Sequence, residues 1–417
     1  MPVPPITARG AGRAGPVARG SVARVGTATA LSALCGYLVL YLAARDLDPA
    51  GFAVFAVFWG AFGLVNGAAN GLLQESTREV RTARRTTESA GPWTRPLRVA
   101  AGLGTAAALV AVATAPLWSG RVFADERVLS ILLLAAGVAG FCMHATVLGM
   151  LAGVDRWSAY GALMVTDAAM RVAVATAGFV IGWGLGGYLW ATVAGSVAWL
   201  LVLLVSPGAR AAALLRTPGT AGSFLRGAAH SITAAGASAV LVMGFPVLLK
   251  ATAGDLGAAG GVLILAVTAT RAPLLVPLTA LQGNLVAHFV DQRARRLAAL
   301  VAPALVVAAA GGLGVVAARL VGPWLLTTLF GPDYHADGML LAWLTVAAVV
   351  IAMLTLTGAA TVAAAAHRAY ALGWVTATAV AAVVLLLPWE LQTRTVAALL
   401  CGPLLGIGVH LAALRRA

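Results

Sequence analysis

The sequence predicts an all-α polytopic membrane protein with twelve transmembrane helices in two six-helix bundles. The first observation behind this prediction is composition: of 417 residues, 61% are hydrophobic and only 10% are charged. Soluble domains carry about 25% charged residues, so no room is left for a sizeable soluble domain. The second is that the apolar residues fall into twelve long blocks. The third is that basic residues gather in every second loop.

The blocks have the length that a membrane span requires. A bilayer core of about 30 Å needs roughly 20 apolar residues per helix. The first six blocks lie at about 24–44, 50–74, 97–118, 128–153, 157–182 and 185–206, and the second six at about 223–250, 256–289, 296–320, 337–365, 369–388 and 393–414. Block 256–289 contains Pro273 and Pro277, which predicts a broken or tilted helix.

These blocks divide the chain into four parts. Residues 1–21 show no apolar periodicity and are expected to form a disordered cytoplasmic tail. Residues 22–206 form the first bundle and 223–417 the second. Residues 207–222, rich in proline and glycine, are the expected cytoplasmic linker.

The loops indicate the orientation of the chain. With a cytoplasmic N-terminus, 20 of the 28 Lys and Arg residues lie on the cytoplasmic side, six lie outside and two lie within blocks. Short cytoplasmic loops are enriched in Lys and Arg. Both termini are therefore expected in the cytoplasm, with the protein in the plasma (inner) membrane. Charge spread over loops is also unlike the folded basic face of a nucleic-acid binder, so no nucleic-acid partner is expected.

The two halves carry a weak internal repeat. Asp46-Leu47-Asp48-Pro49-Ala50-Gly51 and Asp255-Leu256-Gly257-Ala258-Ala259-Gly260 share the pattern Asp-Leu-x-x-Ala-Gly at an offset of 209 residues. Six spans per half give both repeats the same orientation, about an axis along the membrane normal. Two such lobes predict alternating access around a site between them.

Three segments resemble a known family. LDPAGFAVFAVFWGAFGLVNGAANGLLQESTREV (Leu47 to Val80), TRAPLLVPLTALQGNLVAHF (Thr270 to Phe289) and WLLTTLFGPDY (Trp324 to Tyr334) are similar to the second helix, the eighth helix and an outer segment of Wzx-like polysaccharide flippases. These belong to the multidrug/oligosaccharidyl-lipid/polysaccharide exporter superfamily. The resemblance implies a V-shaped pair of bundles that moves lipid-linked sugars across the plasma membrane, with a cationic central cavity. The lipid II flippases of the superfamily typically have fourteen helices, which argues against that branch.

Two arginines lie deep within blocks, where a charged side chain costs about 2.5–3.5 kcal/mol on insertion scales. Arg171 follows Asp167 by four residues, on one helix face and in the favourable order. This pair is interpreted either as a structural ion pair or as an anion site with a titratable partner. Arg271 has no acidic residue within a helical turn. It is predicted to face a polar cavity and bind a diphosphate, because arginine holds phosphate bidentately; the alternative is a pair with Asp167 across the lobes.

Three further polar residues are candidates for the same cavity. Gln282 lies on the inner part of the eighth span and is expected either to line the cavity or to hydrogen-bond between helices. Arg24 and Arg226 begin the first and seventh spans and are candidates for the cavity mouth, with ordinary positive-inside charge as the alternative. Cys35, Cys142 and Cys401 lie in apolar spans without metal-ligand spacing, so neither a metal nor a cofactor is expected.

The predicted function is to flip a polyprenyl-diphosphate-linked oligosaccharide from the cytoplasmic to the outer leaflet. A lipid-linked glycan and membrane lipids are the expected partners, H⁺ or Na⁺ is a candidate coupling ion, and a monomer is expected. The first alternative is a cation-coupled multidrug or small-molecule exporter. Such an exporter favours cavity carboxylates, whereas Asp167 is the one clearly mid-membrane acid. The second is a membrane glycan polymerase or ligase, for which the outer loops are short. The prediction is a transporter, not an enzyme.

The topology can be tested by cysteine accessibility. Cysteines introduced for Arg84, Asp125 and Asp333 in a cysteine-free background should react with an impermeant reagent from opposite sides. Position 84 should be cytoplasmic, and positions 125 and 333 should be outside. Labelling of positions 84 and 333 from the same side would contradict the twelve-span arrangement.

Overall fold

The fold is seen in a computed structural model that describes residues 19–85, 91–123, 125–292 and 296–416. Within these ranges, eleven helices are long and apolar enough to cross a membrane, and a bent helix pair supplies a twelfth span. The prediction of an all-α, multi-pass membrane protein is therefore confirmed. Most of the expected tail, residues 1–21, lies outside the described residues, and the first helix begins at Arg19.

The first half of the chain supplies six spans. They are α1 (Arg19–Asp46), α2 (Pro49–Arg85), α3 (Pro96–Val122), α4 (Arg127–Gly153), α5 (Trp157–Ile181) and a sixth span built from α6 (Gly184–Ala194), the 3₁₀ turn η1 (Gly195–Val197) and α7 (Ala198–Val205). At 37 residues, α2 is about 55 Å long at ~1.5 Å per residue, so it extends well beyond a bilayer core.

The segment expected as a linker has structure of its own. Helix α8 (Pro207–Ala213) begins at a serine cap, where the Ser206 hydroxyl accepts from the Ala209 N–H. Strand β2 (Thr217–Pro218) then pairs antiparallel with β1 (Trp93–Thr94), which precedes α3. This short pairing ties the connection between the two halves to the first half.

The second half supplies the remaining elements. They are α9 (Ala221–Val242), α10 (Phe245–Ala253), α11 (Gly257–Ala280), α12 (Gln282–Asp291), α13 (Arg296–Leu320), α14 (Gly322–Phe330), α15 (Gly338–Ala363), α16 (His367–Leu385) and α17 (Leu391–Arg416). The expected outer loop after the ninth span is thus partly helical, as α14.

Two spans are interrupted, one as expected and one not. The eighth span breaks at Leu281, four residues after Pro277. The seventh span covers the predicted block, but its bend is not indicated by the sequence pattern: α9 and α10 meet at 64°. Its cause is local, since Gly244 lies at the break and Pro246 lies in the first turn of α10, where its missing N–H is tolerated.

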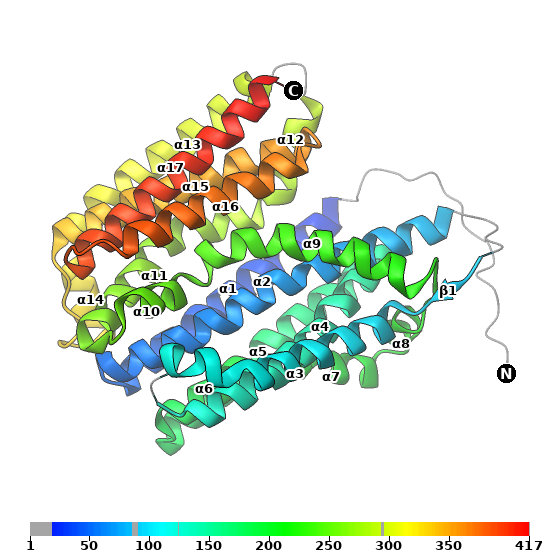
Figure 1. The fold of residues 1–417 in the computed structure, drawn as a ribbon, viewed down its shortest axis with the longest axis horizontal. Helices are drawn as coiled ribbons and strands as arrows, with labels where there is room; N and C mark the ends of the chain where they lie inside the picture. The colour runs from blue at the N-terminus through cyan, green and yellow to red at the C-terminus, as the bar shows by residue number, and fades with distance from the viewer. Residues whose placement is uncertain (1–18, 86–90, 124, 293–295, 417) are drawn as a thin grey trace.

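The helices form two lobes that meet at one end and diverge at the other (Figure 1). Helices α1 and α3–α7 form the first lobe, and α13–α17 form the second, with α2, α9 and α11 between them. The packing partners repeat: α3 packs on α4 as α13 packs on α15, and α1 packs on α5 as α9 packs on α16. This correspondence is what two repeats of the same orientation require.

The lobes are joined where they meet, at the end with α6, α10 and α14. The Tyr334 hydroxyl donates to the Leu47 carbonyl at 3.1 Å, and the Tyr334 ring lies edge-on to Phe52 at 5.9 Å between centroids. Burial, and then the charges of Asp48 and Asp333, raise the pKa of Tyr334. The phenol therefore stays protonated and remains a donor at neutral pH.

Helix α2 also packs closely on α9 along a glycine face. A Cβ atom on Gly71 would meet the backbone of Ser231 and Ile232, and one on Gly67 would meet the side chain of Ala239. The first part of α9 lies against the first lobe here, because Phe224 and Ala228 are buried in one cluster with residues of α2, α3 and α4.

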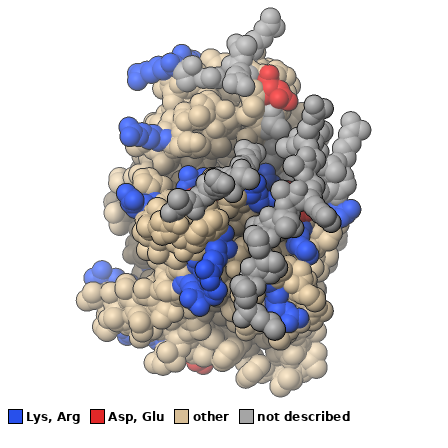
Figure 2. Space-filling view, turned by 90° about the vertical axis from the view of Figure 1, so that its right-hand side faces the viewer, with Lys and Arg blue, Asp and Glu red and all other residues tan. Residues whose placement is uncertain are grey.

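Basic residues gather at the diverging end, shown in Figure 2. The arginine-rich end carries exposed side chains from the start of α1, the end of α2, the start of α3 and the neighbouring loops: Arg24, Arg78, Arg84, Arg98, Arg156 and Arg216. The positive charge is dense enough that Arg98, and then Arg216, lower the pKa of Arg95.

The α2–α9 contact can be tested with alanine. Gly71→Ala should destabilise the protein by about 1–3 kcal/mol, because the new methyl group forces two backbones apart. Gly102 on α3 has open space around its Cα, so Gly102→Ala should be neutral or slightly stabilising. Thermal unfolding in detergent would measure both. Equal effects of the two substitutions would exclude a close α2–α9 contact.

Candidate functional site

Asp167 and Arg171 form the ion pair that their spacing predicts. Arg171 donates to Asp167 Oδ1 from Nε at 3.0 Å and from Nη2 at 2.9 Å. The two side chains are 11% and 19% exposed, for Arg171 and Asp167 in that order. Both lie on α5, inside the first lobe.

The remaining groups of Arg171 are also occupied. Its Nη1 donates to the Thr192 carbonyl on α6. Its guanidinium carbon lies 5.2 Å from the centre of the Phe62 ring on α2. The pair lies against Gly195, where a Cβ atom would collide with the Asp167 carboxylate, so the 3₁₀ turn at this point leaves room for the pair. The geometry is that of a largely buried ion pair whose donors are satisfied within the first lobe.

A histidine on α4, His144, interacts electrostatically with both members of this pair. His144 on α4 is 2% exposed and stacks on Phe141 with 5.1 Å between ring centroids. Its Nδ1 is buried and has no hydrogen-bond partner among the described residues. Asp167, Arg171 and His144 thus bring three titratable side chains together within one lobe, although the sequence spacing predicted only the first two as neighbours.

Arg271 occupies a different environment, between the lobes. It lies on α11 with its guanidinium carbon 5.2 Å from the centre of the Phe245 ring on α10. It also interacts electrostatically with Tyr37 on α1. Only 7% of Arg271 is exposed, and its Nη2 has no hydrogen-bond partner among the described residues. The expected alternative, a pair with Asp167, is not formed, because the salt bridge of Asp167 is with Arg171.

The other candidates are dispersed. Gln282 is the first residue of α12, and its side chain lies outside the described residues. Arg226 is exposed on α9. Arg24 on α1 donates from Nη1 to the Ser158 hydroxyl at 2.9 Å, on the first lobe. Whether Arg24 and Arg226 form the mouth of a cavity between the lobes stays a prediction.

Two neighbours of Arg271 could not be found from the sequence. Tyr37 and Phe245 are 234 and 26 residues away, and ordinary apolar periodicity gave no reason to single them out. No cluster of three or more His, Cys, Asp or Glu side chains that could hold a metal occurs in the described part of the chain.

The structural role of the Asp167–Arg171 pair can be tested by breaking it. Arg171→Gln should destabilise the protein by about 3–5 kcal/mol, because it leaves a buried carboxylate unpaired. The double variant Asp167→Asn/Arg171→Gln should recover most of that loss, since neither charge remains. Unfolding midpoints in detergent would compare the three proteins. A fully stable Arg171→Gln protein would show that the pair contributes little to folding.

Solved structures show where this fold occurs. The chain superposes on an inward-facing structure of a multidrug resistance MATE family transporter of the MOP superfamily with a TM-score of 0.70, at 14% identity over 93% of this chain and 96% of that chain. An outward-facing structure of such a transporter gives 0.64, at 15% identity over 95% and 94% of the two chains. A MOP superfamily transporter from Pyrococcus furiosus, described as having a binding pocket of reverse polarity that suggests a different function, gives 0.60 at 13% identity over 95% of each chain. The fold is thus that of the MATE transporters.

Sequence comparison gives closer relatives, although no known family profile matches the chain. An uncharacterized protein of Mycobacterium bovis is 66% identical over 413 residues, which cover 99% of this chain and 96% of that protein. An uncharacterized protein of Mycobacterium tuberculosis is 67% identical over 402 residues, covering 96% and 93% of the two chains. The chain belongs to the same family as these mycobacterial proteins.

Proposed function

We propose that this protein is a flippase that moves a polyprenyl-diphosphate-linked oligosaccharide across the plasma membrane by alternating access, for cell-surface polysaccharide biosynthesis. In this proposal the arginine-rich end faces the cytoplasm, with both chain termini, and the diphosphate binds to Arg271 between the lobes. The observation that carries the proposal is the unsatisfied guanidinium of Arg271.

The cost of placing Arg271 at this position supports a functional role. Its surroundings include two aromatic rings, and it has no carboxylate partner among the described residues. A buried charge without a partner is costly, and a buried donor without an acceptor adds to the cost. Arg171 avoids both costs through Asp167 and Thr192. A site that leaves its donor free is suited to an anionic ligand, and a diphosphate offers several acceptor oxygens to a planar guanidinium.

The arrangement of the lobes supports alternating access. The lobes are joined at the Tyr334 end, whereas α12 at the diverging end packs on α13 and α15 of its own lobe. The inward-facing MATE structure gives the higher of the two TM-scores quoted above. With the arginine-rich end in the cytoplasm, this conformation would receive a substrate from the cytoplasmic side.

A cation-coupled exporter of drugs or other small molecules is the second candidate. The multidrug transporters with the same fold favour it, as does the partly buried carboxylate of Asp167. Asp167, however, is neutralised by Arg171, and Arg271 between the lobes is cationic. This polarity is better matched to an anion than to a cationic drug. In either case H⁺ or Na⁺ is the candidate coupling ion. We also propose a monomer, because the two lobes of one chain provide a complete transport path.

A glycan polymerase or ligase fits less well. Such an enzyme needs a set of catalytic groups on an outer segment. In the described chain, the segment between α13 and α15 contains α14 and a short turn whose Tyr334 is used to join the lobes. Of its two acids, Asp333 and Asp337, the second caps α15 by accepting from the N–H groups of Met339 and Leu340.

Substitution of Arg271 tests the proposal. Arg271→Met preserves the length and the contact with Phe245 but removes the charge, so the protein should fold with unchanged or higher stability. Transport should nevertheless be lost, and the lipid-linked glycan should accumulate in the cytoplasmic leaflet. Arg271→Lys should retain part of the activity, because the charge persists while the bidentate fork is lost. Lipid extraction from a deletion strain complemented with each variant would measure the accumulation.

A matched control distinguishes the loss of a positive charge at Arg271 from the loss of a positive charge elsewhere on the protein. Arg319 is an exposed arginine on α13 of the second lobe, and Arg319→Met should complement fully. Normal complementation by Arg271→Met would contradict the proposed role of Arg271. A deletion strain that accumulates no lipid-linked glycan but becomes sensitive to cationic drugs would favour the exporter instead.

A further inference from the structure

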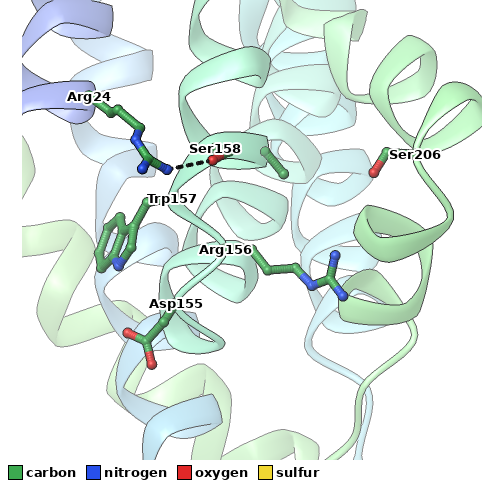
Figure 3. A pocket seen from close by; sticks show the side chains of 7 residues that line it. Arg24, Asp155, Arg156, Trp157, Ser158 and Ser206 are labelled. Carbon is green, nitrogen blue, oxygen red and sulfur yellow. Dashed lines mark hydrogen bonds between the residues drawn. The ribbon is translucent and has the colours of Figure 1, made fainter. Parts of the chain in front are cut away.

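A pocket of about 530 Å³ opens on the first lobe at the arginine-rich end. Three elements far apart in the sequence form it: the start of α1, the loop into α5, and the junction of α7 with α8. Its polar lining consists of Arg24, Asp155, Arg156, Ser158 and Ser206, with the Trp157 ring beside them (Figure 3). None of these residues takes part in the site around Arg271.

The charge balance of the pocket favours an anion. Arg24 donates from Nη1 to the Ser158 hydroxyl, and its other N–H groups remain available to a ligand. The Arg156 guanidinium has no bonded partner among the described residues and lies next to Gly208 at the start of α8. The one acid, Asp155, is already bound by Arg81 at 3.3 Å and by Arg84 at 2.7 Å. Figure 3 shows its carboxylate on the other side of the loop from the Arg156 guanidinium.

Further donors point to the same kind of ligand. The Ser206 oxygen accepts from the Ala209 N–H, so its own proton remains free to be donated. No side chain caps the start of α5, a helix of 25 residues whose first N–H groups would favour an anion. Two guanidinium groups, a hydroxyl and this helix start together match the oxygens of a phosphate group.

The pocket also lies at the ends of three candidate spans, where lipid head groups are expected. One span begins at Arg24, another begins at Trp157, and a third ends at Val205, next to Ser206. Tryptophan is enriched at this depth of the membrane. Below the pocket α7 presents a strongly exposed apolar surface through Leu200, Leu201, Leu204 and Val205. This surface suits acyl chains that descend from a head group held in the pocket.

We infer that this pocket binds a phosphate group at the membrane surface, and that Arg24 and Arg156 grip it from two sides. A phosphodiester of an anionic phospholipid and free inorganic phosphate share the chemistry that the pocket recognises, and the depth of the pocket favours the lipid. The inference concerns the first lobe alone and does not depend on the proposed function of Arg271.

The inference can be tested by counting bound lipids. The purified full chain, taken from nanodiscs of phosphatidylglycerol mixed with phosphatidylcholine, should retain phosphatidylglycerol in native mass spectrometry. Arg24→Gln/Arg156→Gln should weaken this retention about tenfold or more, the effect of losing roughly 1.4 kcal/mol or more of charge-assisted hydrogen bonding. Arg210→Gln is the matched control. This exposed arginine on the same end donates to the Leu204 carbonyl, has no other hydrogen-bond partner among the described residues and does not line the pocket.

Inorganic phosphate provides the second arm of the test. If free phosphate raises the unfolding temperature of the wild type, but not of the double variant, the pocket takes soluble phosphate. If phosphatidylglycerol raises the unfolding temperature of the wild type but not of the double variant, and free phosphate does not, the pocket binds the lipid. Arg156→Gln alone gives the same readout without disturbing a bonded side chain, in case the double variant folds poorly. Equal retention by wild type, Arg156→Gln and the double variant, or no binding of either probe, would overturn the inference.

Discussion

The close packing of α2 against both lobes is the constraint on which the rest of the structure depends. One face of α2 carries Gly67 and Gly71, which let α9 approach to backbone contact. The same helix buries Phe52, Phe55, Phe58 and Phe62 against its other neighbours. A helix with small residues on one face and aromatic residues elsewhere can contact two lobes without a layer of side chains keeping them apart. Because α9 and α11 both pack against α2, this helix fixes their positions and therefore the position of Arg271.

The two buried arginines show how differently one side chain can be accommodated in an apolar protein. Arg171 is neutralised within a single helix and bonded to a second one, so it holds α5 and α6 together whatever the lobes do. Arg271 lies between elements of both lobes and keeps a donor unused. Its environment must change whenever α1, α10 and α11 move relative to one another. A charge whose surroundings depend on conformation can couple ligand binding to motion, because the ligand then stabilises one arrangement over the other.

Much of the architecture was predictable because membrane spans leave a strong signal in sequence. Block lengths, proline positions and the i,i+4 spacing of Asp167 and Arg171 all report local geometry, and the structure agrees with them. The bend between α9 and α10 was missed because Gly244 and Pro246 lie inside an apolar block of ordinary length. The surroundings of Arg271 and the pocket at Arg24 were missed for another reason. Tyr37, Phe245, Arg156 and Ser206 reach these places only through tertiary packing, which periodicity along one helix does not encode.

The bend in the seventh span has a mechanical consequence. The first turns of α9 are buried in the first lobe through Phe224 and Ala228, and both α9 and α10 also contact α16 of the second lobe. Helix α10 contacts α3 of the first lobe as well. The seventh span is therefore packed on both lobes, and Met243 and Gly244, at the break between α9 and α10, are its hinge. If the lobes rock against each other, the backbone dihedral angles at this hinge must change, or one end of the span must lose its packing against a lobe. Its stiffness would then limit how fast the two lobes can rock against each other, whichever residues lie between them.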